Sequence, residues 1–141
     1  MLSTRRKRIF KAFADAVETY ANGLEIYFSE QSAFAVPSSK QQGIVIYPVQ
    51  DSLVRREKFG EIRALQVSVA YFERLGKFQL YENVAIEIYR LARSEAVRTL
   101  TLDQVEQEVR WEIIEPDLHV MITTYRFLYL DPVSRDVAWQ S

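Results

Sequence analysis

Apolar residues near the start of the chain recur with the period of an α-helix. Spacings of three and four residues place them on one face, and most charged residues fall elsewhere. The apolar positions are Phe10, Phe13, Val17, Tyr20 and Leu24. Ser3 or Thr4 can cap the beginning of this helix, and Asn22-Gly23 supplies a left-handed stop. The pattern predicts an amphipathic helix from about Thr4 to Ala21.

A short β-branched segment predicts a strand at residues 43–47. Pro48 follows this segment and is expected to limit its extension, because proline cannot donate a ladder hydrogen bond. An alternating segment at residues 24–28 predicts a weaker strand, and the polar residues 29–42 indicate a loop between the two. Residues 51–60 are rich in charge and are expected to connect two strands.

Strict alternation of apolar and smaller or polar residues predicts a strand from Glu61 to about Glu73. One face of this strand is strongly apolar: Leu65, Val67, Val69 and Tyr71. Gly76 then marks a turn into a second helix, expected from about Gln79 to Arg98. The apolar stripe of this helix is Leu80, Val84, Ile88 and Leu91, with Ala85 and Ala92 beside it.

Two alternating segments close the chain, from Val105 to Ile113 and from Leu118 to Leu130. The turn Glu115-Pro116-Asp117 between them is too short for a crossover, so we expect them to pair antiparallel. The sequence therefore predicts an α+β fold. It consists of a four- to five-stranded, mainly antiparallel sheet with two helices packed on one face.

The final strand carries apolar residues on both of its faces in its second half. Tyr125, Phe127 and Tyr129 alternate on one face, and Leu128 and Leu130 lie on the other. Such a strand needs a cover on each side. A loop or the C-terminal tail can supply it, or another subunit can. The eight Tyr and eight Phe of the chain favour a subunit interface, where aromatic residues are enriched.

Composition narrows the class of protein. The chain has 141 residues, which predicts a single domain over residues 1–141. It is 48% hydrophobic, which argues against intrinsic disorder. Its formal net charge of −1 gives no overall electrostatic attraction to nucleic acid or to an anionic membrane surface. The absence of cysteine excludes disulfides and suits a reducing cytoplasm. We expect no secretory signal and no membrane span.

No residue pattern predicts catalysis. His119 is the single histidine and lies in a predicted strand, with no cysteine and no nucleophile motif in the chain. Glu106, Glu108 and Glu112 share a strand face with Arg110, which is typical of a solvated or inter-subunit polar face. We therefore expect a protein that is not an enzyme and has no catalytic residue, metal site or cofactor.

Two features bear on nucleic acid. Tyr125, Phe127 and Tyr129 alternate as do the stacking residues of sheets that bind single-stranded RNA, but buried core aromatics share this pattern and the flanking glycine motif is absent. The basic run Arg5-Arg6-Lys7-Arg8 stands at a helix N-terminus, where the helix dipole disfavours it. This position favours an acidic partner for the run.

The order and character of these elements resemble the tail-terminator proteins of long-tailed bacteriophages, the group like minor tail protein U. Those proteins are small and cysteine-poor, and they run helix, hairpin, helix, hairpin. The likeness covers most of the chain and rests on pattern, since the family has no short invariant motif. The stretches that carry it are Phe10–Gly23, Gly43–Pro48, Glu61–Tyr71, Tyr81–Arg93, Trp111–Ile114 and Met121–Leu130.

The resemblance implies a structural virion protein that works by binding. Family members form a hexameric ring on the head-proximal end of the tail tube, stop its polymerisation and present a surface to the head. The implied partners are other copies of the chain, the tail tube protein, a head-completion or neck protein, and genomic DNA passing through the ring. The implied location is the tail or neck of the virion, after assembly in the host cytoplasm.

By analogy, three sets of residues become candidate contact sites. Arg55, Arg56 and Lys58 would face the tube or the neck. The run Arg5, Arg6, Lys7 and Arg8 would face another subunit or DNA, and Tyr125, Phe127 and Tyr129 would line a subunit interface. The long connection at residues 29–42 departs from the family pattern. A head–tail connector or neck adaptor, and a cellular nucleic-acid-binding domain, remain the alternative functions.

Overall fold

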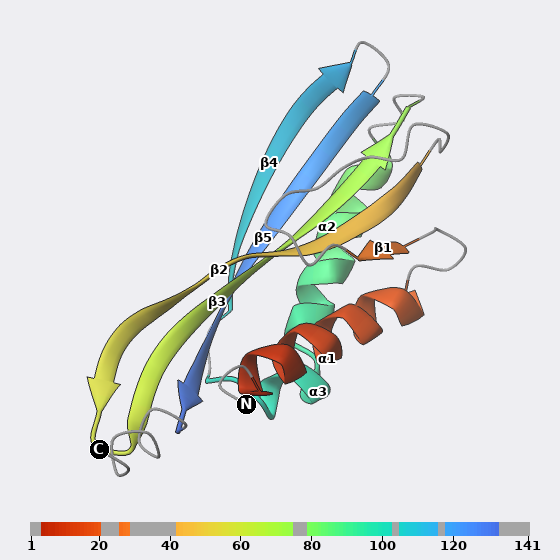
Figure 1. Cartoon of the computed structure of the whole chain (residues 1–141). Helices are drawn as coiled ribbons and strands as arrows, with labels where there is room; N and C mark the ends of the chain where they lie inside the picture. Colours follow the sequence, from red (N-terminus) through yellow and green to blue (C-terminus); the bar gives the residue numbers. More distant parts are fainter. Residues whose placement is uncertain are drawn as a thin grey trace.

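The computed structural model describes residues 4–20, 26–28, 42–74, 79–102, 105–115 and 118–132. Its elements in chain order are α1 (Thr4–Tyr20), β1 (Ile26–Phe28), β2 (Gln42–Glu57), β3 (Gly60–Glu73), α2 (Gln79–Ala92), α3 (Glu95–Arg98), β4 (Glu106–Glu115) and β5 (Leu118–Asp131). The strands form one five-stranded sheet in the order β1-β2-β3-β5-β4 (Figure 1). β1 runs parallel to β2, and the other neighbours pair antiparallel. The predicted α+β class is confirmed.

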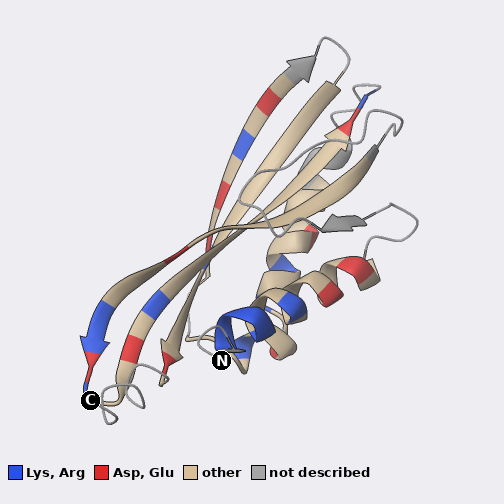
Figure 2. Cartoon of the chain, in the orientation of Figure 1, with Lys and Arg blue, Asp and Glu red and all other residues tan. Residues whose placement is uncertain are grey.

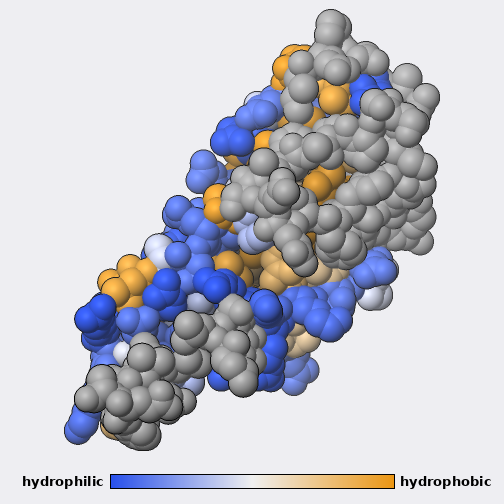
Figure 3. Space-filling model, in the orientation of Figure 1, coloured by the Kyte–Doolittle hydropathy of each residue, from blue (hydrophilic) through white to orange (hydrophobic). Residues whose placement is uncertain are grey.

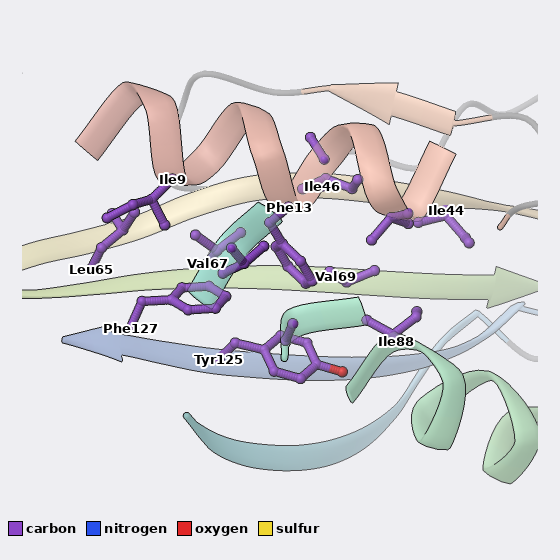
Figure 4. Packing of buried hydrophobic residues seen from close by; sticks show 14 of the residues in the cluster. Ile9, Phe13, Ile44, Ile46, Leu65, Val67, Val69, Ile88, Tyr125 and Phe127 are labelled. Atoms are coloured by element: carbon purple, nitrogen blue, oxygen red, sulfur yellow. The ribbon is translucent and has the colours of Figure 1, made fainter. Parts of the chain in front are cut away.

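The helices pack on one face of the sheet, as the apolar stripes predict. Phe13 of α1 and Ile88 of α2 point into the same layer as Val67 of β3 (Figure 4). The fully buried members of this cluster include Ile9, Phe13, Val17, Ile44, Ile46, Val67, Val69, Ile88, Val97, Tyr125 and Phe127. Residues at helical and period-two spacings thus meet in one continuous core.

A smaller cluster is buried on the opposite face of the sheet, near the start of β2 and of β5. Its members are Val45, Tyr47, Ala70, Phe72, Leu118, Val120 and Ile122. The first half of β5 is therefore buried on both faces. In the second half, Leu128 and Leu130 are only half-buried. The sequence predicted that the second half of this strand is covered on both faces, but it is the first half that is buried on both faces.

β2 continues through Pro48 as far as Glu57, so the predicted end of this strand is wrong. Two local facts explain how a strand accommodates this proline. β1 pairs with β2 at Ile44–Ile46, so Pro48 lies beyond that pairing, where no N–H is required on that side. The register with β3 also shifts between Pro48 and Gln50, as at a β-bulge.

The predicted second helix is divided. α2 ends at Ala92, and α3 begins at Glu95 after Ser94, whose backbone is extended with φ −64° and ψ 159°. Serine favours caps over helix interiors, which accounts for a break in this position. The weak first strand is confirmed as β1. Of the predicted loop at residues 29–42, Gln42 belongs to β2, and of the predicted turn at 115–117, Glu115 belongs to β4. The other residues of both segments lie outside the described residues, and so does Trp139.

Candidate subunit-contact surfaces

β2 and β3 form a long hairpin that extends past the helices (Figure 1). Every residue from 52 to 59 is exposed, and we call this segment the hairpin arm. The charged segment at 51–60 was expected to link two strands, but it is the second half of β2 with the tight turn into β3. Three large apolar side chains of the arm are 41–56% exposed: Leu53, Val54 and Phe59. Figure 3 shows apolar surface among hydrophilic residues at this end of the molecule.

The predicted contact residues Arg55, Arg56 and Lys58 all lie on this arm, at one end of the molecule (Figure 2). Arg55 pairs with Glu57, and Arg56 Nε lies 3.6 Å from a carboxylate oxygen of Glu61. Lys58 Nζ lies 5.7 Å from the centre of the Phe59 ring. Exposed pairs of this kind contribute little to folding. The three cations therefore remain available to a partner.

A buried acidic group holds the root of the arm, and the sequence analysis did not identify it. The Asp51 side chain is only 5% exposed, and it accepts hydrogen bonds from Arg63 Nε at 2.6 Å and from the Tyr129 hydroxyl. Arg6 of α1 lies 3.7 Å away. The bond to Asp51 raises the pKa of Arg63, while burial and the Asp51 carboxylate raise the pKa of Tyr129. Asp51 thus joins α1, β2, β3 and β5.

The basic run at the start of α1 is split by this arrangement. Arg5 and Arg6 are half-buried, and Arg6 faces Asp51, whereas Lys7 and Arg8 are exposed. The first turn of α1 has no acidic residue of its own. Asp51 therefore supplies a negative charge next to a helix N-terminus that carries only cations. The part of the run that is open to a partner is Lys7 and Arg8.

Tyr125, Phe127 and Tyr129 are not on a surface. Their exposed fractions are 0%, 0% and 2%, and the Phe13 ring packs edge-on against Tyr125 and Phe127 at 5.2 and 5.3 Å between ring centres. Gln107 Nε2 donates a hydrogen bond of 2.8 Å to the Tyr125 hydroxyl, and burial raises the pKa of Tyr125 to about 12. The expected inter-subunit aromatic strand is therefore wrong. The same burial excludes base stacking on these rings.

β4 offers a second exposed surface. Sequence reasoning identified its charged face as solvated or inter-subunit but missed its exposed apolar face. It is an outer strand, paired with β5 along one side. Val109, Trp111 and Ile113 are 40%, 49% and 68% exposed on the face that the helices occupy elsewhere. The other face carries three glutamates and one arginine: Glu106, Glu108, Glu112 and Arg110. Alternation identified the strand, but only the strand order shows that it lies at the edge.

His119 lies in β5 between Glu73 of β3 and Ile113 of β4, and its side chain is half-buried. No group of three His, Asp or Glu residues within the described ranges is arranged to hold a metal ion. Among the helices that the structure describes, none is both long and apolar enough to cross a membrane.

The sequence matches no protein-family model and no curated protein. In solved structures, the chain is similar to one chain of "Virion of native gene transfer agent (GTA) particle", with a TM-score of 0.46 and 10% sequence identity. The match covers 89% of this chain and 96% of that chain. At this level of likeness the comparison assigns no function, so the functional argument rests on the surfaces described above.

Proposed function

We propose that this chain is a phage tail terminator, a structural virion protein whose copies form a ring on the head-proximal end of the tail tube. The ring, hexameric by family resemblance, ends tube polymerisation and provides the surface on which the head docks. The observation that carries this proposal is the hairpin arm, in which the end of β2 and its turn into β3 are exposed at every residue from 52 to 59. An exposed apolar and basic arm supports a protein that acts by contact with other subunits.

The remaining features fit a role that depends on binding. The order helix, hairpin, helix, hairpin agrees with the family pattern, with α3 as an addition. Lys7 and Arg8 are exposed cations that suit a surface passed by DNA in the ring lumen. The proposed partners are further copies of this chain, the tube protein and a neck protein.

The experiment mixes the purified chain with tube protein from the same source genome and measures tube lengths by negative-stain electron microscopy. Short tubes of uniform length with one capped end are expected. Reversing the arm charges (Arg55→Glu, Arg56→Glu, Lys58→Glu) should abolish this effect while the variant stays folded. A matched triple reversal on exposed cations of α2 and α3, and of the turn between them, should cap normally: Arg90→Glu, Arg93→Glu and Arg98→Glu.

The outcomes separate the alternatives. Normal capping by the arm variant would contradict the role of the arm. Tubes that grow unchecked with the unmodified chain would contradict the terminator function. A head–tail joining assay with purified heads and tails would then test the neck-adaptor alternative.

A further inference from the structure

Exposed large apolar side chains gather on two surfaces of the described chain. One surface is the hairpin arm with Leu53, Val54 and Phe59, and the other is β4 with Val109, Trp111 and Ile113. Two strands, β3 and β5, lie between β2 and β4 in the sheet. The arm and β4 also lie toward opposite ends of the molecule (Figure 1). One copy therefore cannot cover either surface with the other.

The two surfaces carry opposite charge. The arm has three cations and one carboxylate, Glu57, so its charge is 3 − 1 = +2. β4 between residues 106 and 113 has three carboxylates and one cation, Arg110, so its charge is 1 − 3 = −2. In each surface the minority charge is paired internally, Glu57 with Arg55 and Arg110 with Glu112. The excess charges are exposed: Lys58 and Arg56 on the arm, although Arg56 also lies 3.6 Å from Glu61, and Glu106 and Glu108 on β4.

Within the part of the chain that the structure describes, neither surface has a strand paired along its outer backbone edge. β4 pairs with β5 along one side and is the last strand of the sheet on the other. β1 pairs with β2 only at Ile44–Ile46, so among the described residues no strand follows β2 along the arm on that side. Open edges favour strand addition, and charges on them select the partner strand.

We propose that the hairpin arm of one copy docks along β4 of the next copy. The contact joins two different patches of the same chain, so it is heterologous and repeats from copy to copy. It closes into a ring when the rotation per copy divides a full turn. This inference rests on the proposed ring-forming function and adds the residues that form its subunit contact. It assigns the arm to a neighbouring copy and not to the tube.

Cysteine trapping tests the contact directly, because the chain has no cysteine of its own. Two variants, Val54→Cys on the arm and Val109→Cys on β4, are mixed, oxidised and digested, and the disulfide-linked peptides are identified by mass. The expected result is a severalfold excess of the mixed 54–109 disulfide over the two like-with-like disulfides. Ile86→Cys replaces Val109→Cys as the control, because Ile86 is an apolar residue on α2 that is more exposed than Val109, at 58% against 40%.

Charge exchange tests the same contact independently. Reversing the arm triplet should abolish the 54–109 disulfide, and so should reversing β4 (Glu106→Lys, Glu108→Lys, Glu112→Lys). A chain with both triplets reversed should recover it, because the charges are again complementary. Circular dichroism confirms that each variant is folded. Failure of the doubly reversed, folded chain to recover the disulfide would overturn the proposal.

The trapping is carried out on the free protein and on capped tubes. Like-with-like disulfides in excess, or a yield equal to the Ile86 control in both settings, each overturn the inference. Capping without the 54–109 disulfide would reject this contact and leave the terminator function standing. The disulfide without any effect on tubes would reject the terminator function and leave the contact.

Discussion

β2 and β3 pass through two environments, and the contrast between them separates stability from binding. At one end, Ile44 and Val45 of β2 are buried on opposite faces of the sheet, in two different clusters. At the other end, β2 stays paired with β3 as far as Glu57, with a register shift between Leu53 and Arg55, and residues 52–59 are exposed throughout. Strand pairing therefore does not require burial. The helix-covered part, which we call the body, holds the apolar contacts that stabilise the fold. The residues of the arm contribute little to folding, so they can serve binding to a partner.

The largest expected effect comes from Phe13→Ala in the body. Phe13 is fully buried and packs edge-on against Tyr125 and Phe127, so its loss leaves a cavity between α1 and the sheet. The free energy of unfolding should fall by about 3–5 kcal/mol. Urea denaturation followed by circular dichroism measures this change. Phe59→Ala, on the exposed arm, should change stability by less than about 1 kcal/mol; equal losses would contradict the division between body and arm.

Asp51→Ala tests the junction of the two regions. It removes the carboxylate that Arg63 and Tyr129 share. Arg63 keeps its 2.9 Å bond to Glu61, whereas the Tyr129 hydroxyl loses this acceptor. A loss of about 3 kcal/mol is expected, because the charged bond to Arg63 is lost and a buried hydroxyl loses its partner. Asp15→Ala is the matched control, since Asp15 pairs with Lys11 on an exposed helix face. That control should cost less than about 1 kcal/mol in the same denaturation assay.

Tyr125 makes the stability of the body depend on alkaline pH. Its pKa rises from 10.0 to about 12 in the folded chain because of burial. Between these values the unfolded chain has released the proton and the folded chain retains it. The stabilisation is therefore complete below pH 10 and is lost as pH rises through 12, by about 2.7 kcal/mol. Tyr125→Phe should reduce this slope in urea titrations from pH 9 to 12. An unchanged slope would show that other groups cause the alkaline loss.

Gly60→Ala should weaken the tight turn between β2 and β3 at the end of the arm. Gly60 has φ +148°, and a Cβ atom there would lie 2.6 Å from the backbone oxygen of Asp131. The backbone oxygen of Asp131 cannot rotate away as a flexible side chain could. The free energy of unfolding should therefore fall by about 1–3 kcal/mol. Ser52→Ala on the exposed part of the arm serves as the control. The thermal midpoints of the two variants, compared by circular dichroism, should differ by several degrees.

The sequence predicted the body better than the sites, for a physical reason. Periodicity is imposed by burial, so the stripes of α1 and β3 identified the helix-covered face correctly. Alternation cannot tell a core strand from an interface strand, because both are apolar on one face. Tyr125, Phe127 and Tyr129 were therefore assigned to an interface, although α1 covers them.

The features that were missed depend on contacts between distant segments. Asp51 is one of many carboxylates in the sequence, and only the fold brings Arg6, Arg63 and Tyr129 around it. The edge position of β4 depends on the strand order, which local patterns do not encode. Pro48 was taken as a strand end, since nothing in the sequence indicates that β2 loses its parallel neighbour before that residue.

The smallest expected effect on folding comes from reversing the charges of Arg55, Arg56 and Lys58. Their contacts with Glu57, Glu61 and Phe59 are exposed, so the free energy of unfolding should change by less than about 1 kcal/mol. The same variant is expected to lose capping altogether. Urea denaturation beside the tube-length assay measures both properties on one sample. A variant that loses stability and capping together would show that the arm acts through the body, whereas loss of capping alone places the binding function in the arm.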